Sequence, residues 1–283
     1  TKETLNTPVS KFGSRCEVPD DFIKSVIKLG VMDAAISLTE LKDNKAAKKT
    51  DGRKTKSIRG IPKLMDANWA GTTRSSECIL ILCEGDSAKA GIVSGLCKED
   101  RNKYGVFPLK GKLLNVLDIS QSKLNENCEI SSIKKIMGLE TNQEYKDMAD
   151  IKKRLRYGKV LFMTDQDLDG AHIKGLCLNL FHSQWHDLVK IDSFLGFMNT
   201  PIIKATKGSM VKSFYYEIEY EDWKKTHNDG KGWKIKYYKG LGTSCAKEFK
   251  EYFKNKKEVC FKWSGTDCDN SMDKVFNKKR ADD

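Results

Sequence analysis

Asp165, Asp167 and Asp169 stand at alternate positions just before Gly170. Carboxylates this close together do not fit a hydrophobic core, because an unpaired charge is too costly to bury. Beyond a buried strand they would repel one another unless a hard divalent cation lay among them. Oxygen ligands of this kind favour Mg²⁺ over zinc, with Mn²⁺ or Ca²⁺ as substitutes. The spacing therefore predicts a magnesium site.

Two other structures share this acidic motif. A calcium-binding EF-hand loop needs a Glu at its twelfth position, where this sequence has Leu176, and a helix where we expect a strand before Asp165. The EF-hand interpretation is therefore disfavoured. A solvated acidic turn that binds no ion remains an alternative.

Two apolar runs are expected to position these carboxylates. Residues 78–83 are continuously apolar, which is typical of a strand buried on both faces, and the run ends at Glu84. Residues 160–163 repeat the pattern and end just before Asp165. A helical pattern follows each run, which predicts an α/β fold with a parallel sheet that binds ligands beyond the carboxyl ends of its strands. If the two strands are neighbours, Glu84 joins the aspartates in a metal site suited to phosphodiester chemistry.

The remaining elements are expected from periodicity and turn residues. Helices are expected around residues 22–36, 88–96, 133–139, 173–188 and up to Phe253, and strands at 214–218 and 233–238. Either Asp86 or Ser87 can cap the helix that follows Glu84. Residues 42–60 are rich in Lys and Arg. They predict a mobile basic linker that contacts phosphates, or else a solvated loop without a partner.

Several other residues have weaker signals. Lys110 and Lys112 flank Gly111, and Lys239 precedes Gly240; both segments suit contact with a phosphate backbone or are simple turns. His182 and His186 lie four apart on an expected helix but lack a His-Glu-x-x-His motif, so core or surface histidines are expected. The sequence has no phosphate-binding loop of the G-x-x-x-x-G-K-[ST] type.

The composition limits the class of protein. The 283 residues carry a formal net charge of +12, which favours an anionic partner, nucleic acid first. No apolar run approaches the roughly 20 residues that span a bilayer, so we expect no membrane partner. Nine cysteines without a C-x-x-C pair indicate a reducing compartment. The first residue is Thr, so we expect a piece of a longer protein.

With these motifs assembled, the chain resembles eukaryotic-type DNA topoisomerase II along essentially its whole length. The TOPRIM module of that family is marked by Glu-Gly-Asp-Ser-Ala, present at 84–88, and by Asp-x-Asp-x-Asp-Gly, present at 165–170. Further matches are Gly60–Leu64, Tyr104–Leu109, Met163–Asp167 and Tyr237–Ser244. The TOPRIM signature alone also fits primases and related nucleases, whereas the Tyr-Lys-Gly-Leu-Gly block is typical of type II enzymes.

The resemblance implies an organisation for the chain. Residues 1–50 would be the C-terminal part of a transducer domain, with Lys2 reaching ATP, and 51–77 a basic linker. Residues 78–195 would be the TOPRIM core, a parallel sheet flanked by helices. Residues 196–283 would be an α+β extension toward a winged-helix domain. The ATPase domain and the tyrosine that attacks DNA would lie outside this chain, which alone would be inactive.

The resemblance also implies roles for the residues. Glu84, Asp165 and Asp167 would be catalytic Mg²⁺ ligands, and Asp169 would support or share their site. The residues expected to contact DNA are Lys110, Lys112, Lys239, Gly240, Arg53, Lys54 and Lys56. Many members of the family have Arg where Lys110 stands, and Lys lacks its planar fork.

The whole enzyme would be an ATP-dependent homodimer that passes one duplex through a transient break in another. It would act in the nucleus, or in the cytoplasm or virion if virus-encoded. Two alternatives remain: a TOPRIM nuclease or primase, and a non-catalytic nucleic-acid-binding module.

Overall fold

The computed structural model describes residues 18–280, so Lys2 lies outside the described residues. The chain forms two compact units, and the boundary between them lies between Ala46 and Ala47. Each unit is described by itself. The first unit contains α1 (Asp20–Lys28) and most of α2 (Val31–Thr50), separated by Gly30 with a φ of +69°. A helix was expected at 22–36, and two are present. The basic stretch from Lys42 to Thr50 belongs to α2, so the prediction of a linker there is wrong.

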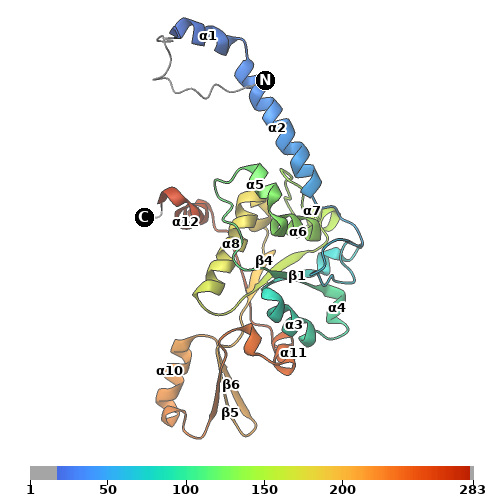
Figure 1. Cartoon of the computed structure of the whole chain (residues 1–283). Coiled ribbons are helices and arrows are strands. Elements are labelled where there is room, and N and C mark those ends of the chain that lie inside the picture. The colour runs from blue at the N-terminus through green and yellow to red at the C-terminus, as the bar shows by residue number, and fades with distance from the viewer. Residues whose placement is uncertain (1–17, 281–283) are drawn as a thin grey trace. The chain divides into compact units, whose positions relative to one another are not determined.

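The second unit is built on a five-stranded sheet in the order β2-β1-β3-β4-β8. Figure 1 labels β1 and β4 of this sheet. The strands are β1 (Ile79–Glu84), β2 (Tyr104–Leu109), β3 (Lys159–Met163), β4 (Leu195–Met198) and β8 (Glu258–Cys260). The first four run parallel, and only β8 pairs antiparallel, with β4. The predicted parallel α/β sheet is confirmed.

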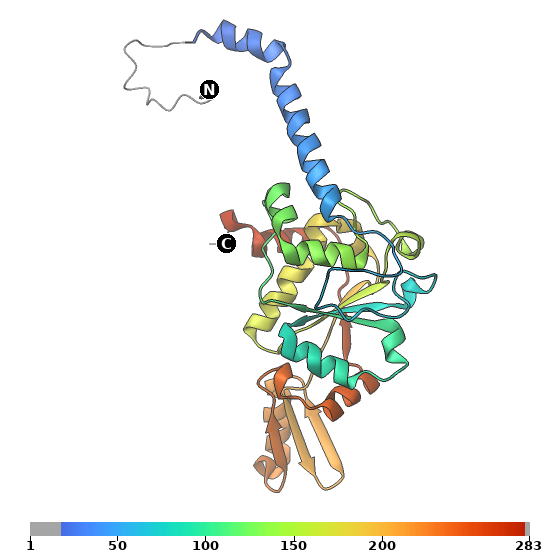
Figure 2. The same cartoon turned by 45° about the vertical axis from the view of Figure 1, so that its right-hand side comes forward.

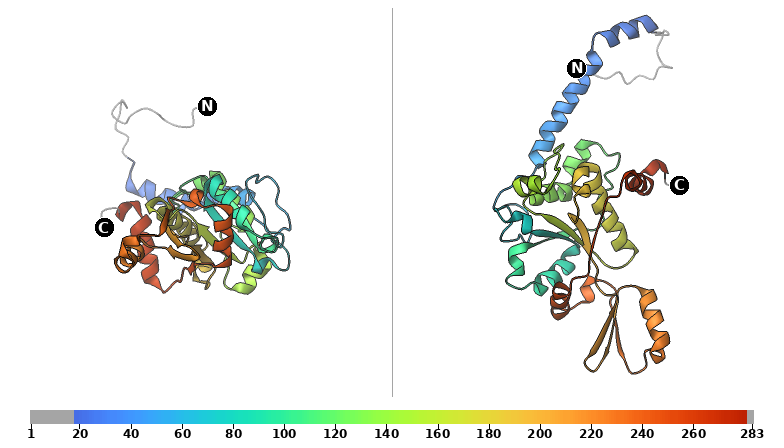
Figure 3. Two further views of the ribbon diagram at one scale, coloured as in Figure 1. Left: turned by 90° about the horizontal axis from the view of Figure 1, so that it is seen from below. Right: turned by 180° about the vertical axis from the view of Figure 1, so that it is seen from behind.

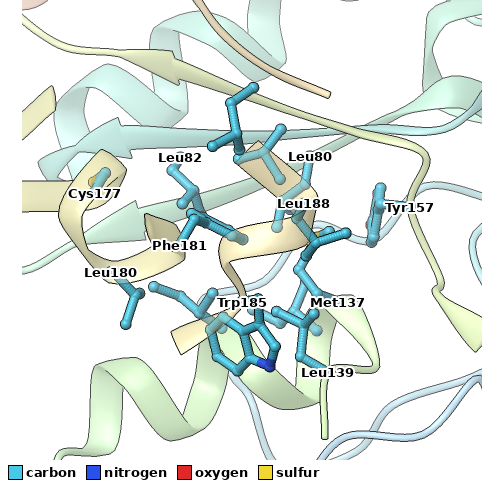
Figure 4. Close-up of a cluster of buried hydrophobic side chains, with 14 of the residues drawn as sticks. Leu80, Leu82, Met137, Leu139, Tyr157, Cys177, Leu180, Phe181, Trp185 and Leu188 are labelled. Carbon is cyan, nitrogen blue, oxygen red and sulfur yellow. The ribbon is translucent and has the colours of Figure 1, made fainter. Parts of the chain in front are cut away.

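Each face of this sheet is covered by helices, because β1 is apolar on both sides. Leu80 and Leu82 belong to the larger core cluster, whereas Ile81 and Cys83 belong to the core on the opposite face. The larger cluster includes side chains of α6 (Cys128–Met137) and α8 (Leu168–Gln184), such as Phe181 (Figure 4). The opposite face packs against α3 (Gly85–Gly95) and α11 (Ala246–Lys254). Further α-helices of the unit are α4 (Asp100–Lys103), α5 (Gln121–Glu126), α7 (Met148–Arg154), α9 (His186–Lys190) and α12 (Thr266–Phe276).

A second, smaller sheet has the antiparallel order β6-β5-β7, with α10 packed against it (Figures 2 and 3). Its strands are β5 (Ile203–Lys207), β6 (Met210–Phe214) and β7 (Lys234–Tyr237), and α10 spans Glu217–Thr226. The expected strand at 233–238 is confirmed, but the one at 214–218 is wrong. The Glu219 carboxylate accepts the backbone N–H groups of residues 215 and 216 and so starts a helix there.

Residues 51–77 belong to the second unit and pack against its other segments instead of forming a mobile linker. The N–H of Gly52 donates to the Leu139 carbonyl at 2.8 Å, and the Thr55 carbonyl accepts a hydrogen bond from the Arg156 guanidinium at 2.7 Å. Ala67 and Ala70 are buried in the larger core. Among residues 18–280, no helix combines the length and the apolar character needed to cross a bilayer.

Candidate metal centre

The register of the sheet places Glu84 beside the acidic segment that follows β3. Cys83 pairs with Met163 in the parallel β1–β3 ladder, so both chains leave the sheet at the same level. Gly85 turns the chain from β1 into α3 with a φ of +79°, which favours glycine. The two acidic segments predicted to converge therefore meet at one edge of the sheet.

Glu84 lies in an environment that disfavours its negative charge. Among the described residues, its buried Oε2 atom has no hydrogen-bond partner. Burial raises the pKa of Glu84, and the negative charge of Asp165 raises it further. A backbone hydrogen bond from Asp165 opposes this rise in pKa, and the charges of Asp167 and Asp169 add to it. An orphaned carboxylate oxygen among other carboxylates is a site that a divalent cation would stabilise, so these residues fit Mg²⁺.

Asp165 is held in place by the loop before α11. Its Oδ1 atom accepts the Leu241 N–H at 2.7 Å. Gly240 lies so close that a Cβ atom there would be 2.2 Å from Asp165 Oδ2. A side chain at position 240 would therefore displace the Asp165 carboxylate. Gly240 was predicted as a DNA contact. In the structure, its lack of a side chain leaves room for the Asp165 carboxylate.

The other two aspartates bind partners of their own. Asp167 caps α8, where its Oδ1 atom accepts the Gly170 N–H at 2.8 Å. Asp169 is largely exposed, and its carboxylate pairs with Lys112 Nζ at 2.7 Å. Within residues 18–280, no three of these four carboxylates have oxygens within 4.8 Å of one another. We call the edge of the sheet that carries Glu84, Asp165, Asp167 and Asp169 the acidic edge. Asp165 is the charge that acts most strongly on Glu84, so these two residues form its central pair.

Lysines surround this edge. Lys112 pairs with Asp169, and the exposed Lys239 precedes the glycine that contacts Asp165. Lys110 and Lys63 border the same hollow of about 190 Å³. Lys63 also pairs with Asp86 at 2.5 Å, and it received no role from the sequence, although its segment matches the family motif at 60–64.

The helix cap expected after β1 is absent. The residue before α3 makes no side-chain capping bond, so the prediction that Asp86 or Ser87 caps this helix is wrong. The carboxylate of Asp86 instead pairs with Lys63, on a segment that precedes β1.

Arg53, Lys54 and Lys56 are not brought to the acidic edge. Lys54 Nζ donates to the Lys152 carbonyl at the end of α7. The neighbouring Thr55 carbonyl bonds to Arg156, just before β3 begins. These basic residues therefore lie near the amino ends of the strands, whereas Glu84 lies at the carboxyl end.

Comparison with known proteins fits this geometry. Residues 79–192 match the model of the Toprim domain, and residues 198–283 match that of the C-terminal associated domain of TOPRIM. The whole chain is 47% identical to DNA topoisomerase 2-alpha of Rattus norvegicus and 48% identical to DNA topoisomerase 2 of Pisum sativum. The chain belongs to the DNA topoisomerase 2 family.

This chain spans about a fifth of the length of these topoisomerases, 19% in both cases. A solved structure gives the same result: the crystal structure of the Plasmodium falciparum topoisomerase II DNA-binding, cleavage and re-ligation domain. The match has a TM-score of 0.75 at 52% identity and covers 81% of this chain and 31% of that one. The family and the fold expected from the sequence are thereby confirmed.

Proposed function

We propose that this chain is the Mg²⁺-binding Toprim region of an ATP-dependent type II DNA topoisomerase, which makes and reseals a double-strand break for duplex passage. The orphaned Glu84 oxygen beside Asp165, at the carboxyl ends of two parallel strands, carries the proposal. The relatives that match the whole chain are named DNA topoisomerase 2, which supports the reaction.

The residues of the acidic edge have different roles in the proposed cleavage reaction. Glu84 and Asp165 would hold the cation, and Asp167 and Asp169 would add negative charge around it. When bound, Mg²⁺ supplies electrostatic stabilisation of the scissile phosphate and of the departing 3′ oxygen. The Leu241 N–H and the close approach of Gly240 keep the Asp165 carboxylate in a fixed orientation.

The lysines of the same edge position the DNA backbone. Lys110, Lys112 and Lys239 are exposed and present positive charge to the phosphates near the cut. Arg53, Lys54 and Lys56, at the other end of the strands, would contribute to sequence-independent affinity only if the duplex extended that far.

The rest of the proposal concerns the longer protein. Double-stranded DNA is the substrate, the enzyme is a homodimer, and ATP drives duplex passage. The attacking tyrosine and the ATPase domain are expected outside these residues, and the enzyme acts in the nucleus. The nuclease or primase alternative and the non-catalytic module have no comparable support, because the topoisomerase match extends over the whole chain.

A cleavage assay in the longer enzyme tests the proposal. Glu84→Gln removes one charge from the edge and keeps the shape of the side chain. It should lower Mg²⁺-dependent cleavage by roughly 10²–10³-fold, a typical cost of losing one group that stabilises transition-state charge. DNA binding should be retained. Glu77→Gln, at an exposed pair with Arg74, is the matched control and should cleave normally. Cleavage without a covalent tyrosyl–DNA adduct in the unmodified enzyme would refute the proposal in favour of a nuclease.

A further inference from the structure

Two histidines and an aspartate meet in a cluster outside the acidic edge. His182 lies near the end of α8, His186 begins α9, and Asp269 belongs to the first turn of α12. Asp269 Oδ1 lies 2.8 Å from His182 Nε2 and 2.9 Å from His186 Nε2. All three residues are half-buried, and their ligand atoms lie within 4.8 Å of one another. A single ion could therefore contact all three.

The surroundings hold these groups in position. Trp263 Nε1 donates to the same Asp269 oxygen at 3.1 Å. The two imidazole rings are perpendicular, with centroids 4.7 Å apart. Although burial raises the pKa of Asp269, hydrogen bonds from His182, Trp263 and His186 lower it to about 2. The hydrogen bonds thus hold the Asp269 carboxylate between the two imidazoles.

The cluster is also open to solvent. His182, His186 and Asp269 border a surface hollow of about 370 Å³. The exposed carboxylate of Asp118 borders the same hollow. An ion bound by the three side chains would therefore have room for water or a further ligand at its remaining coordination position.

We propose that His182, His186 and Asp269 form a binding site for one divalent transition-metal ion of the Zn²⁺ class. Two imidazole nitrogens and one carboxylate oxygen suit zinc, whereas Mg²⁺ prefers the all-oxygen set of the acidic edge. On binding, each imidazole presents its Nε2 lone pair to the metal and keeps its proton on Nδ1. The ion would fasten α12 to the α8–α9 segment, and this inference is independent of the proposed function.

A zinc titration of the chain by calorimetry tests the site against a purely hydrogen-bonded cluster. His186→Gln keeps an N–H donor near the Nε2 position but removes the imidazole ligand. We expect the unmodified chain to bind one more equivalent of Zn²⁺ than this variant, or to bind that equivalent at least about 100-fold more tightly. His172→Gln, which replaces an exposed histidine on α8, should bind zinc like the unmodified chain. Comparing variants subtracts the zinc bound by cysteines, which are unchanged in all three chains.

Two further measurements keep the test decisive if His186→Gln folds poorly. Asp269→Asn should show the same loss of one zinc equivalent. Co²⁺ bound at the site should give visible d–d absorption that disappears in Asp269→Asn, without the intense bands of thiolate ligands. Equal zinc binding by the unmodified chain and both variants would overturn the proposal and leave only the hydrogen-bonded cluster.

Discussion

The two ends of the central strands hold charged side chains that differ in how well they are paired. Near the amino ends, the Arg156 side chain is fully buried but donates to Asp66 and to the carbonyls of Thr55 and Ile136. At the carboxyl end, Glu84 faces Asp165, and within residues 18–280 its Oε2 atom has no hydrogen-bond partner.

This difference distinguishes a charged residue that stabilises the fold, Arg156, from one that is available to a ligand, Glu84. A buried charge whose hydrogen bonds are all satisfied stabilises the fold only as part of its network, and removing one partner is costly. A carboxylate kept beside like charges costs stability, and groups with pKa values perturbed in this way cluster at functional sites. The same pair of strands therefore anchors the fold at one end and carries the proposed metal site at the other.

The largest effect on stability is expected from removing the Arg156–Asp66 ion pair. Arg156→Ala leaves the Asp66 carboxylate without its charged partner, although it keeps the hydrogen bond from the Tyr157 hydroxyl. We expect the free energy of unfolding to fall by about 3–5 kcal/mol. Urea denaturation monitored by circular dichroism measures the change. Lys225→Ala, which breaks an exposed pair with Asp222, should leave stability nearly unchanged. Equal effects of the two substitutions would contradict the distinction between the two ends.

A glycine substitution tests the other end without removing a charge. In Gly240→Ala the new Cβ would clash with Asp165 Oδ2, so the carboxylate must move. Mg²⁺ affinity should fall roughly 10–100-fold, as for other groups that orient a metal ligand. Gly242→Ala is the matched control, because a Cβ there would have no atom within 4 Å. Identical Mg²⁺ affinities in both variants would show that Asp165 does not hold the ion.

A third charged residue, Glu248, is paired where α11 meets the segment around β7 of the smaller sheet. Glu248 on α11 accepts bonds from Lys236 Nζ, at 2.8 Å to each oxygen, and from the Tyr238 hydroxyl. Burial raises the pKa of Glu248, but the bonds from Lys236 and Tyr238 lower it to about 2. Because the folded-state pKa is depressed, this stabilisation is present above the unfolded pKa of about 4.3 and is lost as pH falls toward 2.

Glu248→Gln should therefore destabilise the chain by about 1–3 kcal/mol at neutral pH. The penalty should shrink as pH falls from 5 toward 2, because the unmodified carboxylate then becomes protonated too. Thermal unfolding across this pH range measures both effects. A penalty that stays constant with pH would contradict the assignment of Glu248 as a paired carboxylate.

The smallest effect is expected at the exposed lysines. Lys112→Ala should weaken DNA binding by the longer enzyme uniformly across sequences. The slope of the logarithm of the binding constant against the logarithm of salt concentration should decrease by about 1. Fluorescence anisotropy at several salt concentrations measures this slope. An unchanged slope would remove Lys112 from the DNA-contacting residues.

The sequence predicted the central strands and their helices because β1 and β3 are continuous apolar runs. It gave no strand signal for β2, where Gly105 and Pro108 interrupt the pattern; an edge strand tolerates such a proline. It also misassigned residues 214–218, because the aromatic residues there resemble a strand while Glu219 starts a helix.

Other parts of the site depend on contacts distant in sequence. The packing of residues 51–77 could not be predicted, because it uses backbone groups that bond to Arg156 about a hundred residues later. The carboxylates of the acidic edge were identifiable from their spacing, but the contact of Gly240 with Asp165 was not. Likewise, His182 and His186 gave no metal signal until the fold brought Asp269 to them.

The most direct test of the central claim is a calorimetric Mg²⁺ titration of the chain with and without Glu84→Gln. If Glu84 and Asp165 hold the ion, the substitution should weaken Mg²⁺ binding at least tenfold. It should not lower the stability of the metal-free chain, because it removes a poorly compensated charge. Glu77→Gln should bind Mg²⁺ normally. Undiminished Mg²⁺ binding by Glu84→Gln would contradict the account.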